Sequence, residues 1–347
     1  MVPNDLFVLS KDQWSTFLKK TASNYEVIAP KDGPYHLEYE RIGEEETDTI
    51  VFPGARLTRP LKYFFYPPRE NVSRDPSPPD KKRVIFGIKA CDLAALSILD
   101  NIYLDPDFVD PFYKTRRDNA IIVSDDCTKP LENCFCVLID GTPFATKNFD
   151  LSLSFIEDQV LVELGSEKGK NLLDNAGIDL RKAGEDLLNR RQEQRQAMIE
   201  QLKEQNKDFE FSPEKLPELV KEMYDSPMWK EICETCVSCG ACSNICPSCH
   251  CFLLTYNQSE DKKFEVLRTW DSCQSAGFSR VAGGANPREK LPSLFQNRFQ
   301  CKIHYKPRNF GVFACTGCGR CNEACQGGID IRRVLSLVAG EATSKST

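Results

Sequence analysis

The sequence predicts an α+β protein with an N-terminal α/β domain, a helical linker and a cysteine-rich C-terminal domain. Three observations lead to this prediction. A strand–helix–strand pattern lies within residues 84–123, a strongly charged stretch covers 179–207, and 13 of the 17 cysteines lie beyond residue 232. At roughly 150 residues per domain, a chain of 347 residues accommodates this division. The expected domains are 1–178, 179–228 and 229–347.

The first part of the N-terminal domain mixes helix and strand patterns. Residues 11–20 have helical composition, and residues 25–28 are typical of a short strand. A proline-rich polar stretch follows at 67–79. Proline lacks a backbone amide donor and is excluded from helix interiors and central strands. We therefore expect this stretch to be an exposed loop.

A βαβ unit is the central element of the predicted domain. Residues 84–88 and 120–123 are short apolar runs with the composition of buried strands, and residues 92–99 between them have an apolar helical face. Such a strand–helix–strand pattern favours two parallel strands. Two further strands, at 151–155 and 159–164, are expected to close the domain.

The charged stretch at 179–207 predicts a long exposed helix, since it is rich in helix formers and has no glycine or proline after Gly184. Its apolar residues are too irregularly spaced for the heptads of a coiled coil. A solvated helix that bridges two domains is therefore favoured over a coiled-coil surface.

Composition excludes several classes of protein. The net charge of −6 argues against nucleic acid as the main partner. No apolar run approaches the roughly 18 residues of a membrane span, and the first residues lack the pattern of a signal peptide. We therefore expect a cytoplasmic protein, in which dense cysteine indicates metal or redox chemistry rather than disulfides. No dinucleotide or ATP motif is recognisable, so no flavin or nucleotide and no catalytic residue is expected in this chain.

A Cys-x2-Cys-x2-Cys-x3-Cys motif occurs twice. This spacing is typical of bacterial two-cluster ferredoxins, in which the fourth cysteine of each motif ligates the other cluster. Zinc, the alternative, usually joins two knuckles separated by a longer loop. We therefore expect a ferredoxin-like domain, with Gly240 and Gly319 removing bulk where the backbone approaches a cluster. The predicted ligands are Cys236, Cys239, Cys242 and Cys325 for one [4Fe–4S] cluster, and Cys315, Cys318, Cys321 and Cys246 for the other.

The remaining cysteines suggest further sites. Four of them follow or lie near the two βαβ strands: Cys91, Cys127, Cys134 and Cys136. Parallel strands end on one edge of a sheet, where α/β folds place ligands, so these thiols are expected to converge on a third [4Fe–4S] cluster. The alternative is four unrelated thiols. Three more, Cys249, Cys251 and Cys273, are either packing residues, the favoured interpretation, or an extra metal site.

Residues 229–252, together with 90–93, 133–136, 270–273 and 282–284, resemble the iron–sulfur subunit that anaerobic sulfite reductases share with cytoplasmic sulfhydrogenases, in which it is the beta subunit. The resemblance runs from about residue 84 to 335. The family carries all the cysteines named above, whereas Cys233 and Cys301 do not match its pattern. The charged helix, and Gln326 in place of the proline expected after the second motif, are departures from the family.

The resemblance implies an electron-transfer subunit of a multisubunit oxidoreductase in an anaerobe. Such a subunit relays electrons between a flavin- and NAD(P)H-binding subunit and a catalytic subunit of the sulfite or sulfur reductase or hydrogenase type. It would perform no substrate chemistry alone. Two alternatives stay open at this point: a self-contained reductase with a substrate-reducing cluster, and a zinc-stabilised interaction scaffold.

Overall fold

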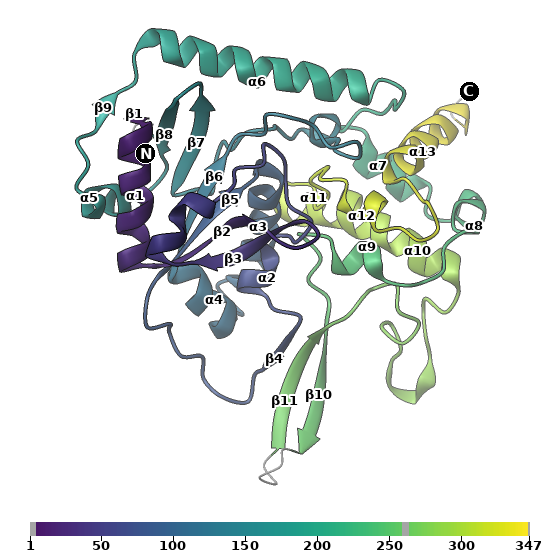
Figure 1. Ribbon diagram of the computed structural model, residues 1–347. Coiled ribbons are helices and arrows are strands. Elements are labelled where there is room, and N and C mark those ends of the chain that lie inside the picture. The colour runs from purple at the N-terminus through teal and green to yellow at the C-terminus, as the bar shows by residue number, and fades with distance from the viewer. Residues whose placement is uncertain (1–4, 259–263, 346–347) are drawn as a thin grey trace.

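A mixed β-sheet forms the N-terminal half of the computed structural model, which describes residues 5–258 and 264–345. Within these residues the sheet has eight strands in the order β3-β2-β5-β6-β7-β8-β1-β9 (Figure 1). The neighbours from β2 to β7 pair in parallel, and the other pairs are antiparallel. The strands are β1 (Leu6–Ser10), β2 (Glu26–Asp32), β3 (Leu37–Ile42), β5 (Arg83–Ile88), β6 (Ala120–Asp125), β7 (Leu151–Ile156), β8 (Gln159–Leu164) and β9 (Arg181–Lys182).

The predicted α+β fold and its βαβ unit are confirmed. Strand β5 leads into α3 (Ala90–Tyr103), and β6 then pairs with β5 in parallel. A β-bulge at Gly87, which has a φ of 76°, shifts the register, so that Ile85 and Ile88 both face the core beneath α3. The chain leaves the bulge towards Lys89 and Cys91 at the carboxyl edge of the sheet.

Helices cover both faces of this sheet. Trp14 and Phe17 of α1 and Leu172 of α5 pack on one face. Leu96 of α3 and Tyr113 of α4 pack on the other. At about 25 cal/mol per Å² of buried apolar surface, these two cores supply the main driving force for folding. The helices of this half are α1 (Lys11–Asn24), α2 (Lys62–Phe65), α3, α4 (Pro111–Asp118) and α5 (Glu167–Ala176), with 3-10 helices at Glu44–Thr49 and Cys136–Ile139.

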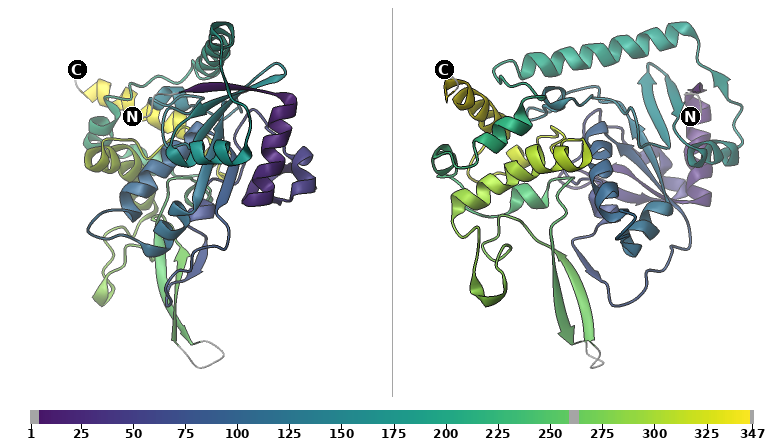
Figure 2. Two further views of the ribbon diagram at one scale, coloured as in Figure 1. Left: turned by 90° about the vertical axis from the view of Figure 1, so that its left-hand side faces the viewer. Right: turned by 180° about the vertical axis from the view of Figure 1, so that it is seen from behind.

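The charged stretch forms α6 (Glu185–Gln205), a long helix that lies across the body of the molecule (Figures 1 and 2). The helix was predicted, but the expectation that it is a solvated helix bridging two domains is only partly correct. Arg191, Met198 and Leu202 are buried. Arg195 donates to both carboxylate oxygens of Asp126, at 2.8 and 3.0 Å, and so attaches the helix to the end of β6.

A second sheet contains part of the segment that was expected to be a loop. Residues Arg69–Asn71 form β4, the edge strand of the sheet β10-β11-β4. The prediction failed here because residues 69–75 contain no proline, so their amide groups can join a sheet edge. Glu70 pairs with Arg268 of β11, whose Nη2 lies 2.5 Å from its carboxylate. The hairpin of β10 (Phe252–Gln258) and β11 (Phe264–Trp270) projects from the body in every view (Figures 1 and 2).

Helices surround the cysteine motifs in the C-terminal half. Their core includes Trp229 and Phe299 of this half and also Phe135 and Ile139 of the N-terminal half, so the two halves share one hydrophobic cluster. None of the helices in the described ranges combines the length and apolar composition that a membrane crossing requires. The helices are α7 (Leu216–Glu222), α8 (Met228–Ile232), α9 (Ala241–Asn244), α10 (Leu291–Phe299), α11 (Lys306–Phe310), α12 (Arg320–Glu323) and α13 (Ile331–Lys345), with a 3-10 helix at Ala282–Gly284 and a π-helix at Gln300–Tyr305.

Candidate iron–sulfur centres

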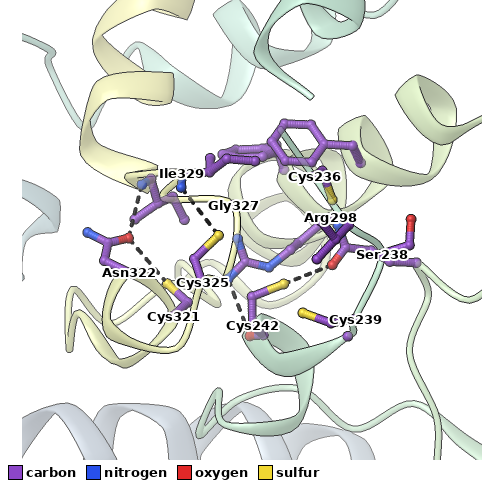
Figure 3. Close-up of a pocket in the computed structure, with 16 residues that line it drawn as sticks. Cys236, Ser238, Cys239, Cys242, Arg298, Cys321, Asn322, Cys325, Gly327 and Ile329 are labelled. Carbon is purple, nitrogen blue, oxygen red and sulfur yellow. Dashed lines mark hydrogen bonds between the residues drawn. The ribbon is translucent and has the colours of Figure 1, made fainter. Parts of the chain in front are cut away.

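The first thiol set lines one pocket (Figure 3). Cysteines 236 and 239 come from the loop that leads into α9, Cys242 lies in α9 itself, and Cys325 comes from the end of the second motif, yet all four border this pocket. The amide of Ile329 donates to the Cys325 thiol at 3.3 Å. Cys321 borders the same pocket, which therefore brings the two motifs together. Crossed ligation, as in two-cluster ferredoxins, stays our prediction for the ligands. We call this set, Cys236, Cys239, Cys242 and Cys325, the first site.

The second set joins the end of the first motif to the start of the second. Buried Lys302 donates to the Cys246 thiol at 3.1 Å and to the carbonyl of Ala314, next to Cys315, at 3.3 Å. The Ser248 hydroxyl donates to the same Ala314 carbonyl. Cys246 is thereby held near the second motif, 69 residues away along the chain. We call the set Cys246, Cys315, Cys318 and Cys321 the second site.

Two of the motif glycines, Gly240 and Gly319, share a left-handed backbone but differ in the space around them. A Cβ on Gly319 would lie 2.1 Å from the carbonyl oxygen of Asn133, so glycine permits this close approach to the Asn133 backbone. A Cβ on Gly240 would meet its nearest neighbour, Ser272, only at 3.7 Å. The φ of Gly240 is 70°, so this glycine is required by its left-handed backbone rather than by a lack of space. The approach of these two glycines to a cluster stays a prediction.

The four upstream cysteines lie in one region at the edge of the sheet. Cys127, Cys134 and Cys136 pack with Met198 and Leu202 of α6. Cys91 lines a cavity together with Cys136. Gln205 and Asn206, at the end of α6, donate to the carbonyl of Cys134 at 3.1 and 2.9 Å. We call Cys91, Cys127, Cys134 and Cys136 the third site.

A buried ion pair holds the third site against the second. Arg320, between Cys318 and Cys321, is fully buried and donates to both carboxylate oxygens of Asp92, at 2.9 and 2.8 Å. Asp92 follows Cys91 directly. The Cys134 thiol also lies 3.8 Å from the carbonyl oxygen of Cys318. The α/β domain and the second motif are therefore in direct contact where both carry cysteines.

The loop cysteines form pairs rather than a group of three. Cys251 and Cys273 are neighbours beside the base of the β10–β11 hairpin, where Cys273 lowers the pKa of Cys251, while Cys249 neighbours Cys246 and lowers its pKa. The interaction with Cys273 lowers the pKa of the Cys251 thiol, against the opposing effects of burial and of the neighbouring Cys301 thiol. This neighbour was not anticipated, since no spacing in the sequence links Cys301 to the hairpin.

Two further residues have packing roles. Burial lowers the pKa of His250 to about 4, and its Nδ1 lies 3.1 Å from the Ser248 carbonyl oxygen. Cys233 is buried in the C-terminal core, 3.5 Å from the carbonyl oxygen of Lys230.

The donor chemistry of the sites fits [4Fe–4S] clusters, which take four thiolates each. In the described part of the chain, no three His, Cys, Asp or Glu side chains gather closely enough to hold a single metal ion. A cubane instead separates its ligands around an iron–sulfide core. Burial raises the pKa of Cys127 and of Cys315 to about 12, so cluster binding must release protons from such thiols. The Cys249 hydrogen bond and the Lys302 cation lower the pKa of Cys246.

Basic residues around the sites were missed by sequence reasoning. Arg56 donates to the carbonyl of Cys318 and pairs with Glu323, Arg298 donates to the carbonyl of Cys242 at 3.5 Å, and Lys302 contacts Cys246. The one available signal was a basic residue beside a cysteine, as at Lys302 and Arg320. That signal does not indicate which way the side chain points.

Comparison with known proteins agrees with this site. Residues 235–329 match the family model of the 4Fe-4S dicluster domain, so the fold and the site together define an iron–sulfur protein of the dicluster class. The chain is also 33% identical to sulfhydrogenase 2 subunit beta of Pyrococcus furiosus over 300 residues, which cover 86% of each chain. It belongs to the family of sulfhydrogenase beta subunits, which confirms the predicted resemblance.

Proposed function

We propose that this chain is the electron-transfer subunit of a multisubunit cytoplasmic oxidoreductase, and that it connects a flavin- and NAD(P)H-binding subunit to a catalytic subunit. The observation that carries the proposal is the contiguity of the three thiol sets. Cys321 of the second site borders the pocket of the first, and Cys134 of the third site contacts the backbone of Cys318. Bound clusters would each accept and release one electron.

The relative from Pyrococcus furiosus is named as a subunit, which supports a role within a complex. A nicotinamide delivers two electrons as hydride, whereas a cubane takes one, so a flavin must divide the pair. No dinucleotide motif is recognisable in this sequence. The proposal therefore assigns flavin binding to a partner subunit.

The isolated chain, reconstituted with clusters, should not be reduced by NAD(P)H. Anaerobic absorption spectroscopy should show no bleaching with NAD(P)H, bleaching with dithionite, and NAD(P)H-dependent bleaching once the flavin subunit is added. Dithionite serves as the control that the clusters are competent. Bleaching of the flavin-free chain by NAD(P)H would contradict the proposal.

The third site gives a prediction of metal content. Because a [4Fe–4S] cluster contains four irons, three loaded sites predict about twelve irons per chain after anaerobic reconstitution. Replacing Cys127 with serine should reduce this to about eight, measured as iron per chain with an electron paramagnetic resonance spectrum of each protein. Replacing Cys233, which lies in no proposed site, is the matched control and should leave iron unchanged. About eight irons in the unaltered chain would exclude a cluster at the third site.

One observation favours a second candidate, a self-contained reductase. A cavity of about 400 Å³ is bordered by Cys91 and Cys136 of the third site and by Cys315 of the second. This volume is within the range of small-molecule sites, and the buried hydroxyl of Thr316 on its wall has no hydrogen-bond partner among the described residues. The reconstituted chain alone, supplied with reduced methyl viologen, separates the two functions. Consumption of sulfite or polysulfide would favour the reductase.

A further inference from the structure

Arg298 is a buried cation at the first site. It lies on α10, is only 6% exposed, and lines the pocket together with cysteines of both motifs (Figure 3). Its Nη2 donates to the carbonyl of Cys242 at 3.5 Å, and its charge opposes the burial that raises the pKa of the Cys321 thiol. Its Nε is buried without a hydrogen-bond partner in the described structure. The side chain thus faces thiols and has unused donor capacity.

Lys302 occupies an equivalent position at the second site. It follows Arg298 by four residues, on the π-helix that continues α10, and is 3% exposed. Its Nζ donates to the Cys246 thiol at 3.1 Å, the Ser248 hydroxyl at 2.9 Å and the Ala314 carbonyl at 3.3 Å. One continuous helical segment therefore places Lys302 at the second site and Arg298 beside the first, where it also faces Cys321 of the second.

Neither cation has a carboxylate partner among the ion pairs of the described residues, in contrast to most other buried cations here. Lys89 pairs with Asp125, Arg191 with Glu163, and Arg320 with Asp92. Lys62, which also lacks a carboxylate, lies 3.8 Å over the ring of Trp270 instead. Burying an uncompensated charge is unfavourable, so Arg298 and Lys302 require negative charge on the cysteine sulfurs that they face.

We infer that Arg298 and Lys302 compensate the negative charge of the clusters at the first and second sites and raise their reduction potentials. This inference rests on the ligand sets of the proposed function. A cubane with four thiolate ligands is anionic, and reduction adds one electron and hence one more negative charge. A fixed cation in a low-dielectric surrounding stabilises that reduced form more than the oxidised form.

The test is a redox titration of the full reconstituted chain, followed by electron paramagnetic resonance. Lys302→Met should lower the midpoint potential of one cluster. At the wild-type midpoint, the ratio of reduced to oxidised cluster should fall about tenfold, which corresponds to about 59 mV for a one-electron couple. Arg298→Met should do the same for the other cluster. Lys302→Arg and Arg298→Lys retain the charge and should shift the ratio about twofold or less. Lys290→Met, at an exposed position before α10, is the matched control.

Iron content separates a failure of the proposed function from a failure of the role that we assign to the two cations. Wild-type protein without cubane signals would overturn the proposed function itself. An unshifted potential in an iron-replete methionine variant would overturn only the role of that cation. If Lys302→Met loses iron, Lys302→Gln retains a hydrogen-bond donor without the charge and takes its place. Loss of iron in the glutamine and arginine variants as well would identify a structural role and refute the inference for Lys302.

Discussion

Replacing Cys325 with serine should empty the first site and spare the second, although Cys325 belongs to the second motif. Cys325 borders the same pocket as Cys236, Cys239 and Cys242, as does Cys321 of its own motif. The spacing of two-cluster ferredoxins assigns Cys325 to the first site and Cys321 to the second. Loss of one thiolate ligand should decrease the content of the reconstituted chain by about four irons. Iron analysis and electron paramagnetic resonance would show the loss of one of the two ferredoxin-type signals.

The reciprocal change completes the experiment. Replacing Cys246 with serine should abolish the signal of the other cluster, because Lys302 and Ser248 hold Cys246 beside Ala314 at the start of the second motif. Replacing Cys233 with serine is the control, since that thiol packs in the C-terminal core. If the Cys325 variant lost the same signal as a Cys318 variant, the crossed arrangement would be wrong.

Replacing Arg320 with methionine should lower the free energy of unfolding by about 3–5 kcal/mol, the typical cost of removing one partner of a buried ion pair. The variant leaves Asp92 buried without its cation, and the carbonyls of Leu57 and Thr58 lose donors at 3.0 Å. Urea titration of the full chain under anaerobic conditions, followed by circular dichroism, measures the change. Arg333→Met, at an exposed position of α13, should change the free energy of unfolding little.

A double-mutant cycle tests whether the pair is the cause. Because apolar replacement of both partners removes the uncompensated charge, Arg320→Met combined with Asp92→Leu should cost less than the sum of the two single changes. If the losses in the free energy of unfolding were additive, Arg320 and Asp92 would contribute to stability independently. In that case the contact between the α/β domain and the second motif would not depend on their ion pair.

The local pattern of the sequence was sufficient to predict much of the fold. The βαβ unit was predicted because the apolar runs that form β5 and β6 are short and flank a helical pattern, all within about forty residues. The antiparallel strands β7 and β8 and the long helix α6 were also predicted. Strand β4 was missed because its partner in the sheet, β11, lies almost 200 residues further along the chain. No local signal identifies such a partner.

The motif spacing alone determined the iron–sulfur class of this protein, because three cysteines within seven residues can converge on one cluster whatever the rest of the chain does. Only the tertiary structure decided what surrounds those cysteines. Arg320 meets Asp92 across 228 residues, and Lys302 meets Cys246 across 56. The physical reason is that a buried charge must find its counter-charge through the packing of distant elements. Sequence spacing controls which thiols are neighbours, but packing controls which cations face them.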